Sequence, residues 1–151
     1  MNNQNVDHTE INQFSQQAHD WWNTQGPYQA LHIINPIRLQ FVQSAAILSD
    51  KECLDIGCGG GLMAEALRKQ GGRVSAIDMD PIAINTAKQH ATAESLTIDY
   101  RMITAEALSI TDSERFDIIT CLEMLEHVPS PESVIQACAA LCKPGGSIIF
   151  S

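Results

Sequence analysis

The sequence predicts an α/β protein whose parallel sheet is doubly wound, with helices on both of its faces. Short apolar runs alternate with stretches of helical periodicity over residues 36–151, and this alternation is typical of parallel strands joined by right-handed helical crossovers. The first apolar run breaks into the sequence GCGGG at residues 57–61, immediately before a predicted helix. The next run ends in Asp78, where a doubly wound sheet places an acid that binds a ribose. We therefore expect parallel strands in the order 3-2-1-4-5.

The residues before this alternating region are predicted to lie outside the sheet. Residues 6–22 have the pattern of an amphipathic helix, and Asp7 with Glu10 resembles a capping box at its start. Two tryptophans, Trp21 and Trp22, end this helix. Packing of at least one of them against the core is favoured over a role in a substrate lid, because an indole has much apolar area to bury.

A loop is expected at residues 25–35. Pro36 then suits the first position of a helix, because proline has no backbone N–H to donate and its φ is already helical. We accordingly divide the chain into an N-terminal helix and loop at residues 1–35, expected to form a lid or cap, and a cofactor-binding sheet domain at residues 36–151.

The remaining elements follow from apolar runs, helical periodicity and breaks at proline or glycine. The expected strands are residues 53–56, 73–77, 96–102, 116–121 and 147–151. The expected helices between them are residues 61–70, 80–93 and 130–141. The sequence KPGG at residues 143–146 is expected to turn the chain into the last strand.

Composition disfavours several classes of function. The 151-residue chain is long enough for one domain, and 18 acidic against 9 basic residues give a net charge of −9, which argues against nucleic-acid binding. Its apolar runs are far shorter than a membrane span, and its first residues lack a signal-peptide pattern. The five cysteines show no metal-type spacing, which is typical of reduced, buried thiols in a cytoplasmic protein.

The glycine spacing indicates which nucleoside cofactor the chain would bind. A dinucleotide fingerprint has the spacing G-x-G-x-x-G, but the third glycine position here is Leu62. The chain instead has Gly57, Gly59 and Gly61 at alternate positions after Asp55. A carboxylate before the glycines is poorly placed for a pyrophosphate and suits a ligand that carries an ammonium and a sulfonium. An NAD-dependent oxidoreductase is therefore disfavoured.

A second group of polar residues follows the expected strand at residues 116–121. Glu123, Glu126 and His127 have the spacing i, i+3 and i+4, so a helix would project all three from one face. Two carboxylates and an imidazole can hold a divalent cation, and the imidazole by itself can act as a general base. A structural reading places the acids at the start of a short helix and His127 at its end. The residues alone leave these alternatives open.

The chain resembles the ubiquinone-biosynthesis O-methyltransferase family over residues 6–151. The segments that carry the resemblance are DHTEINQF, WWN, LHIINPIRL, LDIGCGGG, IDMD, CLEMLEHVP and LCKPGG. The glycine loop and the PGG turn are common to many class I S-adenosylmethionine-dependent methyltransferases, whereas INPIRL, WW and EMLEHV are specific to this family. The resemblance implies a Rossmann-like class I fold, S-adenosylmethionine as the cofactor, and methylation of polyprenylated catechols at two steps of the ubiquinone pathway.

The resemblance also implies roles for individual residues. Cofactor contacts are implied at Arg38, Asp55, Gly57, Gly59, Asp78, Met79 and Leu122. Arg38 would bind the methionine carboxylate and Asp78 the ribose, and Leu122 replaces a methionine of similar volume. Residues 104–106 lie in the usual adenine-binding neighbourhood.

The second group of polar residues matches the metal positions of the same family. Divalent metal ligands, with Mg²⁺ as the ion, are implied at Glu123, Glu126 and His127. The catalytic groups would be His127 and Glu126. His127 would act as a general base if no metal is bound, because a metal-bound imidazole is not free to take a proton.

Two further expectations concern the whole protein. A class I sheet normally has seven strands, so the last two are expected to be missing and the chain to be truncated at its C-terminus. The strand at residues 147–151 would then be an apolar edge that favours self-association and poor turnover. The alternatives are a fragment that binds the cofactor without catalysis and a methyltransferase for another small molecule. The expected location is cytoplasmic, with peripheral contact to the inner membrane or to a biosynthetic complex.

Overall fold

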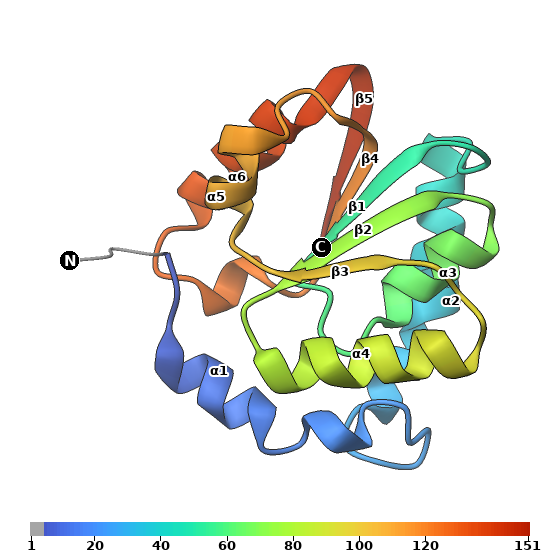
Figure 1. Ribbon diagram of the computed structural model, residues 1–151, viewed down its shortest axis with the longest axis vertical. Helices are drawn as coiled ribbons and strands as arrows, with labels where there is room; N and C mark the ends of the chain where they lie inside the picture. The colour runs from blue at the N-terminus through green and yellow to red at the C-terminus, as the bar shows by residue number, and fades with distance from the viewer. Residues whose placement is uncertain (1–4) are drawn as a thin grey trace.

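The computed structural model describes residues 5–151, and its centre is a five-stranded parallel sheet (Figure 1). The strand order is β3-β2-β1-β4-β5, which confirms the predicted doubly wound topology. The strands are β1 (Glu52–Ile56), β2 (Arg73–Asp78), β3 (Asp99–Met102), β4 (Phe116–Cys121) and β5 (Cys142–Phe150). Because every pair is parallel, the carboxyl ends of the strands meet on one side of the sheet.

Helices cover both faces of this sheet (Figure 1). One face packs against α2 (Gln29–Ala45), α3 (Leu62–Lys69) and α4 (Pro81–Ala93), and the other against α5 (Ala105–Thr111) and α6 (Pro131–Leu141). Successive residues of a strand point to opposite faces. Cys53 and Ile118 therefore pack in the core under α2, α3 and α4, whereas their neighbours Leu54 and Ile119 pack under α5 and α6.

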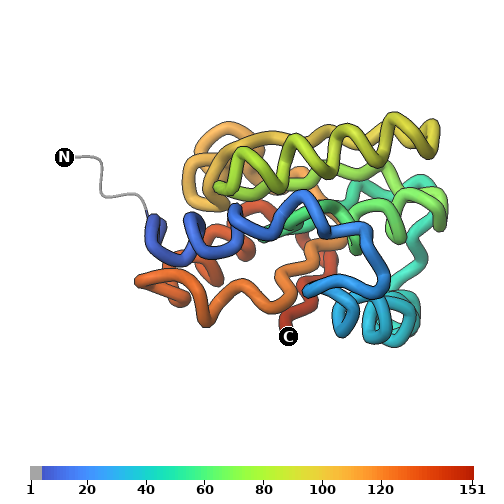
Figure 2. Tube along the Cα trace, turned by 90° about the horizontal axis from the view of Figure 1, so that it is seen from below, coloured from blue at the N-terminus to red at the C-terminus, as the bar shows by residue number. Residues whose placement is uncertain are grey.

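The N-terminal segment is not the single helix predicted for residues 6–22. It forms helix α1 (His8–Ser15) and the short 3₁₀ helix η1 (Ala18–Asp20). Both lie alongside α4 (Figure 2), and the Ser15 hydroxyl donates to the carboxylate of Asp80 at the start of that helix (2.7 Å). This contact places the segment on the side of the sheet where the strands end.

Asp7 caps α1 as the sequence predicts. Its carboxylate accepts the backbone N–H groups of Thr9 (2.8 Å) and Glu10 (3.3 Å). The Glu10 side chain does not reach back to complete a capping box, because it pairs with His127. The local pattern assigns the Glu10 side chain to the helix cap, but a contact with a residue far along the chain uses it instead.

Pro36 lies inside α2 and not at its start, so the predicted helix start is wrong. The first turns of α2 are anchored by His32, whose Nε2 donates to the Trp21 carbonyl (2.8 Å) and whose ring packs edge-on against Trp22 (5.8 Å between ring centroids). These tertiary contacts favour helix before the proline, although proline removes one backbone hydrogen bond there. The predicted boundary between residues 35 and 36 falls within this helix.

Three further elements differ from the sequence prediction. Helix α5 has no predicted counterpart; Thr104 caps it by accepting the Ala107 N–H (3.2 Å). β3 is shorter and begins at Asp99. β5 begins at Cys142, so the KPGG sequence lies within the strand, where a register shift interrupts its pairing with β4. None of these differences changes the order of the strands.

The cysteines pack as apolar side chains. All five are free thiols, and four of them are buried. Burial raises the pKa of Cys53 to about 12, so this thiol is protonated at neutral pH. Within residues 5–151, no helix combines the length and apolar character needed to cross a membrane.

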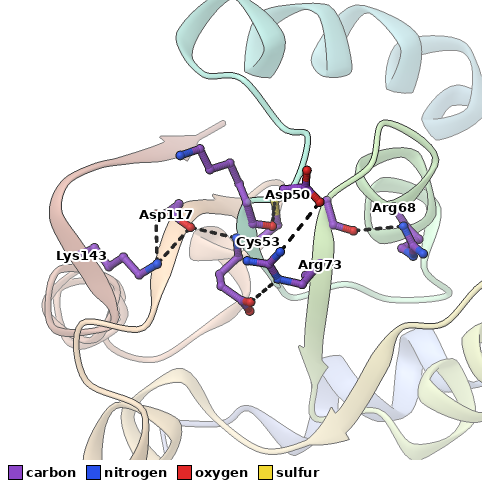
Figure 3. A network of polar contacts seen from close by, with 9 residues as sticks. Asp50, Cys53, Arg68, Arg73, Asp117 and Lys143 are labelled. Atoms are coloured by element: carbon purple, nitrogen blue, oxygen red, sulfur yellow. Dashed lines mark hydrogen bonds and ion pairs between the residues drawn. The ribbon is translucent and has the colours of Figure 1, made fainter.

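A polar network ties the amino ends of the strands together (Figure 3). Asp117 of β4 accepts the Glu52 backbone N–H (2.9 Å) and pairs with the Lys143 ammonium (3.1 Å to each oxygen), which links β4 to β1 and β5. Arg73 of β2 pairs with the Glu52 carboxylate (2.6 Å). The backbone hydrogen bond from Glu52, followed by the Lys143 ammonium, holds the pKa of Asp117 below its usual value.

We expect Asp117→Asn to destabilise the fold by about 1–2 kcal/mol at pH 7, somewhat less than the roughly 1.5–3 kcal/mol of a hydrogen bond to a charged group, because asparagine keeps one acceptor oxygen and the Asp117 side chain is 25% exposed. The native carboxylate binds its proton at a lower pH than the unfolded one. Its contribution is therefore full at neutral pH and is lost as the pH falls below about 4. Urea unfolding of both proteins at pH 7 and pH 3 measures the effect.

The matched control is Asp50→Asn. The Asp50 side chain is 91% exposed and lies 3.9 Å from Arg73, so its contribution is expected to be close to zero. Equal losses of stability in the two variants would contradict the role assigned to Asp117.

Candidate functional site

Two adjoining cavities open where the strands end, beneath the N-terminal segment. The β2-side cavity is bordered by Asp78 and by residues 103–106 after β3. The α2-side cavity is bordered by Arg38 of α2 and by Leu122 after β4. The residues that border both cavities are Phe14, Trp21, Gly57, Glu123 and His127. An elongated ligand can therefore extend from one cavity into the other across Gly57.

Every residue with a predicted site role borders at least one of these cavities. The residues are Arg38, Asp55, Gly57, Gly59, Asp78, Met79, Leu122, Glu123, Glu126 and His127. They come from α2, from the ends of β1 and β2, and from the segment after β4. The fold thus brings together residues up to 89 positions apart, from Arg38 to His127. Their individual roles stay predictions.

The loop between β1 and α3 exposes its backbone to these cavities. Gly57 has a φ of +70° and Gly59 a φ of +51°, a conformation that other residues rarely adopt. A Cβ atom on Gly57 would lie 2.5 Å from Cγ of Met124, and one on Gly59 would lie 2.2 Å from Cζ2 of Trp21. The Gly57 N–H donates to the Ile77 carbonyl (2.9 Å), which fixes the loop against the end of β2.

Asp78 ends β2 and holds the glycine loop. Its Oδ2 accepts the Gly59 N–H (2.8 Å), and its Oδ1 accepts the Asp80 N–H (2.8 Å). A carboxylate can accept about four hydrogen bonds, so acceptor positions remain for a ligand. Burial raises the pKa of Asp78, and the two backbone donors oppose that rise. Asp78 therefore serves both the loop and the β2-side cavity.

Asp55 is a buried acid near the end of β1, with 3% of its surface exposed. It lies beside Thr120 of β4 in the parallel register, and the Thr120 hydroxyl donates to its Oδ1 (2.7 Å). Burial raises the pKa of Asp55 to about 7, the Thr120 hydrogen bond limits the rise, and the negative charge of Asp78 adds to it. A cation in the α2-side cavity would favour the ionised form of Asp55.

Arg38 and Glu123, for which the sequence predicts different ligands, bind each other. Arg38 Nη2 donates to Glu123 Oε1 at 2.5 Å. Glu123 is the second residue after the end of β4. Its φ is +52°, in the left-handed region that a glutamate rarely occupies. A ligand carboxylate that binds Arg38 in the same way would have to displace Glu123.

The predicted helical face formed by Glu123, Glu126 and His127 is wrong. Only Leu125–His127 is helical, as the single 3₁₀ turn η2, and Glu123 precedes it with left-handed backbone geometry. The spacing i, i+3 and i+4 therefore does not align the three side chains. Across residues 5–151, no three His, Cys, Asp or Glu side chains are arranged to hold a metal ion. The carboxylate oxygens of Glu123 and Glu126 suit Mg²⁺, but in this structure the two carboxylates and His127 are not positioned around a common point.

His127 is oriented by helix α1. Its Nδ1 lies 2.8 Å from Oε2 of Glu10, and its Nε2 lies 3.7 Å from Oε1 of Glu126. Phe14 packs edge-on against the imidazole, with 5.0 Å between the ring centroids. When Nδ1–H donates to Glu10, the Nε2 lone pair is left free to accept a proton. A base held by a carboxylate in this way is the arrangement found in general-base sites.

Several residues that border the site have no predicted role in it, among them Glu10, Phe14 and Met124. Glu10 and Phe14 are one helical turn apart, and the predicted helix pattern shows that they share a face. No local spacing connects that face to the strands, so sequence reasoning had no signal for its contact with His127. Trp21 borders both cavities, which supports the site role that the sequence ranks second to core packing.

A doubly wound sheet with a bare glycine loop after β1 and an acid at the end of β2 defines a protein that binds a nucleoside cofactor. Comparison with known families identifies the group within this class. A family profile described as Methyltransferase domain matches residues 54–150, which include all five strands except the first two residues of β1. The chain belongs to this methyltransferase family.

Sequence relatives agree with the resemblance found in the sequence. Over 147 residues the chain is 49% identical to the ubiquinone biosynthesis O-methyltransferase of Stutzerimonas stutzeri, covering 97% of this chain and 63% of the relative. Over 151 residues it is 48% identical to the protein of the same name from Coxiella burnetii, covering 100% of this chain and 64% of the relative. The chain thus spans just under two thirds of the length of these curated relatives.

Solved structures show the same fold. A Methanococcus maripaludis protein named for S-adenosylmethionine-dependent methyl transfer superposes with a TM-score of 0.78. The match covers 98% of this chain and 66% of that chain, at 16% sequence identity. At this identity the likeness concerns the fold alone.

We expect Asp55→Asn to flatten the pH dependence of stability between pH 4 and pH 7. The native carboxyl keeps its proton up to a pKa of about 7, whereas the unfolded one loses it near the usual value of 3.8. The contribution of Asp55 is therefore full below pH 4 and is lost as the pH rises through 7. Urea unfolding across this range measures the slope in the two proteins.

Thr120→Val provides the matched comparison. It removes the hydrogen bond that lowers the pKa of Asp55, so the loss of stability should extend to higher pH than in the unmodified protein. Identical slopes in the Asn variant and the unmodified protein would show that Asp55 does not titrate in this window.

Proposed function

We propose that the chain forms the cofactor-binding part of an S-adenosylmethionine-dependent O-methyltransferase that acts on polyprenylated catechols in ubiquinone biosynthesis. The observation that carries this proposal is the convergence of the residues carried over from that family on two adjoining cavities around the glycine loop. The names of the relatives that are 48–49% identical support the same substrate class.

The site suits S-adenosylmethionine chemically. Asp78 keeps acceptor positions for ribose hydroxyls, and residues 104–106 border the same cavity on the side proposed for adenine. In the α2-side cavity, Arg38 would bind the methionine carboxylate and Asp55 would lie near the ammonium. The missing Cβ at Gly57 allows a ligand to approach the backbone. When bound, S-adenosylmethionine supplies a methyl group on a sulfonium, which is a good leaving group.

The chain would contribute alignment and proton removal. Holding the attacking oxygen in line with the methyl group can lower the barrier by as much as about 7–11 kcal/mol. We infer that Nε2 of His127 takes the proton of the catechol hydroxyl as the oxygen–carbon bond forms and the carbon–sulfur bond breaks. Glu10 would hold Nδ1 in the correct tautomer, and the Glu126 carboxylate near Nε2 would stabilise the imidazolium.

Mg²⁺ binding is the alternative role for the same residues. Glu123 would have to leave Arg38, and His127 would have to leave Glu10, before the two could ligate one ion together with Glu126. A methionine carboxylate that binds Arg38 would release Glu123. The ion pair of Glu123 with Arg38 and the hydrogen bond of His127 to Glu10 support the general-base role. Titration of the protein with Mg²⁺ tests the metal-binding alternative.

The proposed substrate also bears on location and partners. A polyprenyl chain is a hydrocarbon that partitions into lipid. We therefore propose a cytoplasmic enzyme that meets its small-molecule substrate at the inner membrane surface or within a biosynthetic complex. Flotation of the full-length protein with lipid vesicles tests the membrane contact.

We expect Asp78→Ala to weaken S-adenosylhomocysteine binding about 10- to 100-fold in calorimetry, because a hydrogen bond to a charged acceptor contributes roughly 1.5–3 kcal/mol. Some of this loss will come from a looser glycine loop, since Asp78 also accepts the Gly59 N–H. The control is Asp99→Ala. Asp99 is the first residue of β3, so it lies at the end of that strand away from the cavities, and its side chain is 52% exposed. Unchanged affinity in the Asp78 variant would remove this residue from the cofactor site.

We expect His127→Ala in a full-length enzyme to lower kcat by about 10²–10⁴, the usual contribution of a positioned base. Glu10→Gln should lower kcat less, because it weakens only the orientation of the imidazole. EDTA should leave the unmodified enzyme active. Loss of activity in EDTA with recovery on adding Mg²⁺ would instead support the metal role of Glu123, Glu126 and His127.

A further inference from the structure

We propose that Trp21 is a cofactor-contacting residue whose indole N–H donates to an oxygen of the bound cofactor. The proposal rests on the proposed function, since it assumes that the two cavities hold S-adenosylmethionine. It concerns a residue for which the sequence favours core packing. Three observations support it: the placement of the indole, its buried donor, and the contrast with its neighbour Trp22.

The indole of Trp21 lies directly on the glycine loop. A Cβ atom on Gly59 would lie 2.2 Å from its Cζ2, and one on Gly60 would lie 2.1 Å from its Cγ. The opposite side of the ring stacks on Tyr28, with 4.0 Å between centroids and an interplanar angle of 30°. Because Trp21 borders both cavities, a ligand that extends across Gly57 must pass beside this ring.

The indole donor of Trp21 has no partner. Its Nε1 is buried and makes no hydrogen bond to any of the described residues. An indole N–H can only donate, and leaving it unpaired in a buried position is unfavourable. Three other buried side-chain atoms share this condition, on Glu65, Asp80 and Tyr100, and none of these residues borders both cavities. A ligand oxygen that enters at the junction of the cavities would satisfy Trp21 after a small displacement of the ring, because Nε1 has no exposed surface in this structure.

S-Adenosylmethionine carries suitable acceptors on both sides of this junction. Its ribose oxygens would lie toward Asp78 in the β2-side cavity, and its carboxylate toward Arg38 in the α2-side cavity. Its sulfonium, which links the two parts, offers no acceptor. The N–H of Trp21 therefore pairs with a ribose or carboxylate oxygen.

Trp22 carries the same indole donor as Trp21, but its contacts are all with other protein groups and stabilise the fold. Its Nε1 donates to the Gly60 carbonyl (2.9 Å), and its ring stacks on His90 with 3.5 Å between centroids and an interplanar angle of 1°. It borders neither cavity. His90 in turn pairs with the buried Glu65 (2.7 Å), so Trp22 fastens the glycine loop to α3 and α4. Adjacent tryptophans thus serve different purposes, and Trp22 provides a matched control for Trp21.

The test is calorimetric titration of the full-length protein with S-adenosylhomocysteine, using Trp21→Phe and Trp22→Phe. Phenylalanine keeps most of the apolar ring and removes the donor. We expect Trp21→Phe to weaken binding about five- to tenfold, as the loss of one hydrogen bond would, with little change in Tm. We expect Trp22→Phe to lower Tm; because it frees the Gly60 carbonyl of the glycine loop, any loss of affinity should be the same for every ligand of the series described next.

A ligand series locates the acceptor and separates a lost hydrogen bond from lost packing. If the N–H pairs with the carboxylate, the effect of Trp21→Phe should disappear for a ligand that lacks that group, such as decarboxylated S-adenosylmethionine. If it pairs with the ribose, the effect should disappear for a 2′- or 3′-deoxy analogue. Removing the indole donor and removing the ligand acceptor together form a double-mutant cycle. If the two groups are hydrogen-bonded, the second removal costs no further affinity. A penalty that stays the same with every analogue would indicate packing alone and would overturn the proposal.

A second measurement covers the case in which Trp21→Phe folds poorly. In the Trp22→Phe variant, with every tryptophan after residue 151 of the full-length protein also replaced by phenylalanine, Trp21 alone reports on the site, and its fluorescence should change as S-adenosylhomocysteine saturates. No change in that signal, or an affinity within twofold in a folded Trp21→Phe protein, would overturn the proposal. Failure of the unmodified protein to bind S-adenosylhomocysteine is a different result, because it would remove the proposed function itself.

Discussion

The hydrogen bond from the Gly59 N–H to the Asp78 carboxylate is the contact on which the rest of the site depends. It joins the loop after β1 to the end of β2, which the parallel register places side by side. With that loop held in place, its bare backbone is available to whatever lies above it, both a ligand and the indole of Trp21. The same carboxylate keeps acceptor positions on its cavity side. Loop geometry and ligand recognition are therefore coupled through one side chain.

The N-terminal segment completes the site, although it lies outside the sheet. Helix α1 supplies Glu10 and Phe14 to the imidazole of His127, and the turn after η1 supplies Trp21 to the glycine loop. Ser15 fixes this segment to the start of α4 through Asp80. The cavities are thus formed between a rigid sheet edge and a short segment held by a few polar and aromatic contacts.

Two polar side chains of the site are engaged by acids in this structure. Arg38 forms an ion pair with Glu123, and the His127 imidazole is hydrogen-bonded to Glu10, where a zwitterionic ligand is proposed. A ligand carboxylate on Arg38 would release Glu123 from its ion pair. Binding of the cofactor and the availability of Glu123 for a second ligand would then be linked. In this structure, Glu123 and His127 are engaged by Arg38 and Glu10, and the three donor side chains are not gathered around one point.

Local sequence patterns account for the sheet and for the membership of the site. The strands, the glycine loop and the acid at the end of β2 were predictable because each depends on a short apolar run and the residues next to it, and the strand order followed from the topology of the fold class that these features indicate. The same patterns failed where distant contacts compete with them. Pro36 lies within α2, whose first turn is held by the contact of His32 with Trp21, and Glu10 does not complete the capping box because its carboxylate is hydrogen-bonded to His127.

The sequence by itself therefore determined the fold class, the family and ten of the residues that border the site, from Arg38 to His127. Alternation, glycine spacing and family-specific segments are properties of neighbouring residues. Only the tertiary structure decided how those residues are paired. It broke the predicted helical face at Glu123, set Arg38 against Glu123, and placed Trp21 over the loop with its donor unpaired. These pairings depend on distances between segments far apart in the chain, which are set only when the helices pack on the sheet.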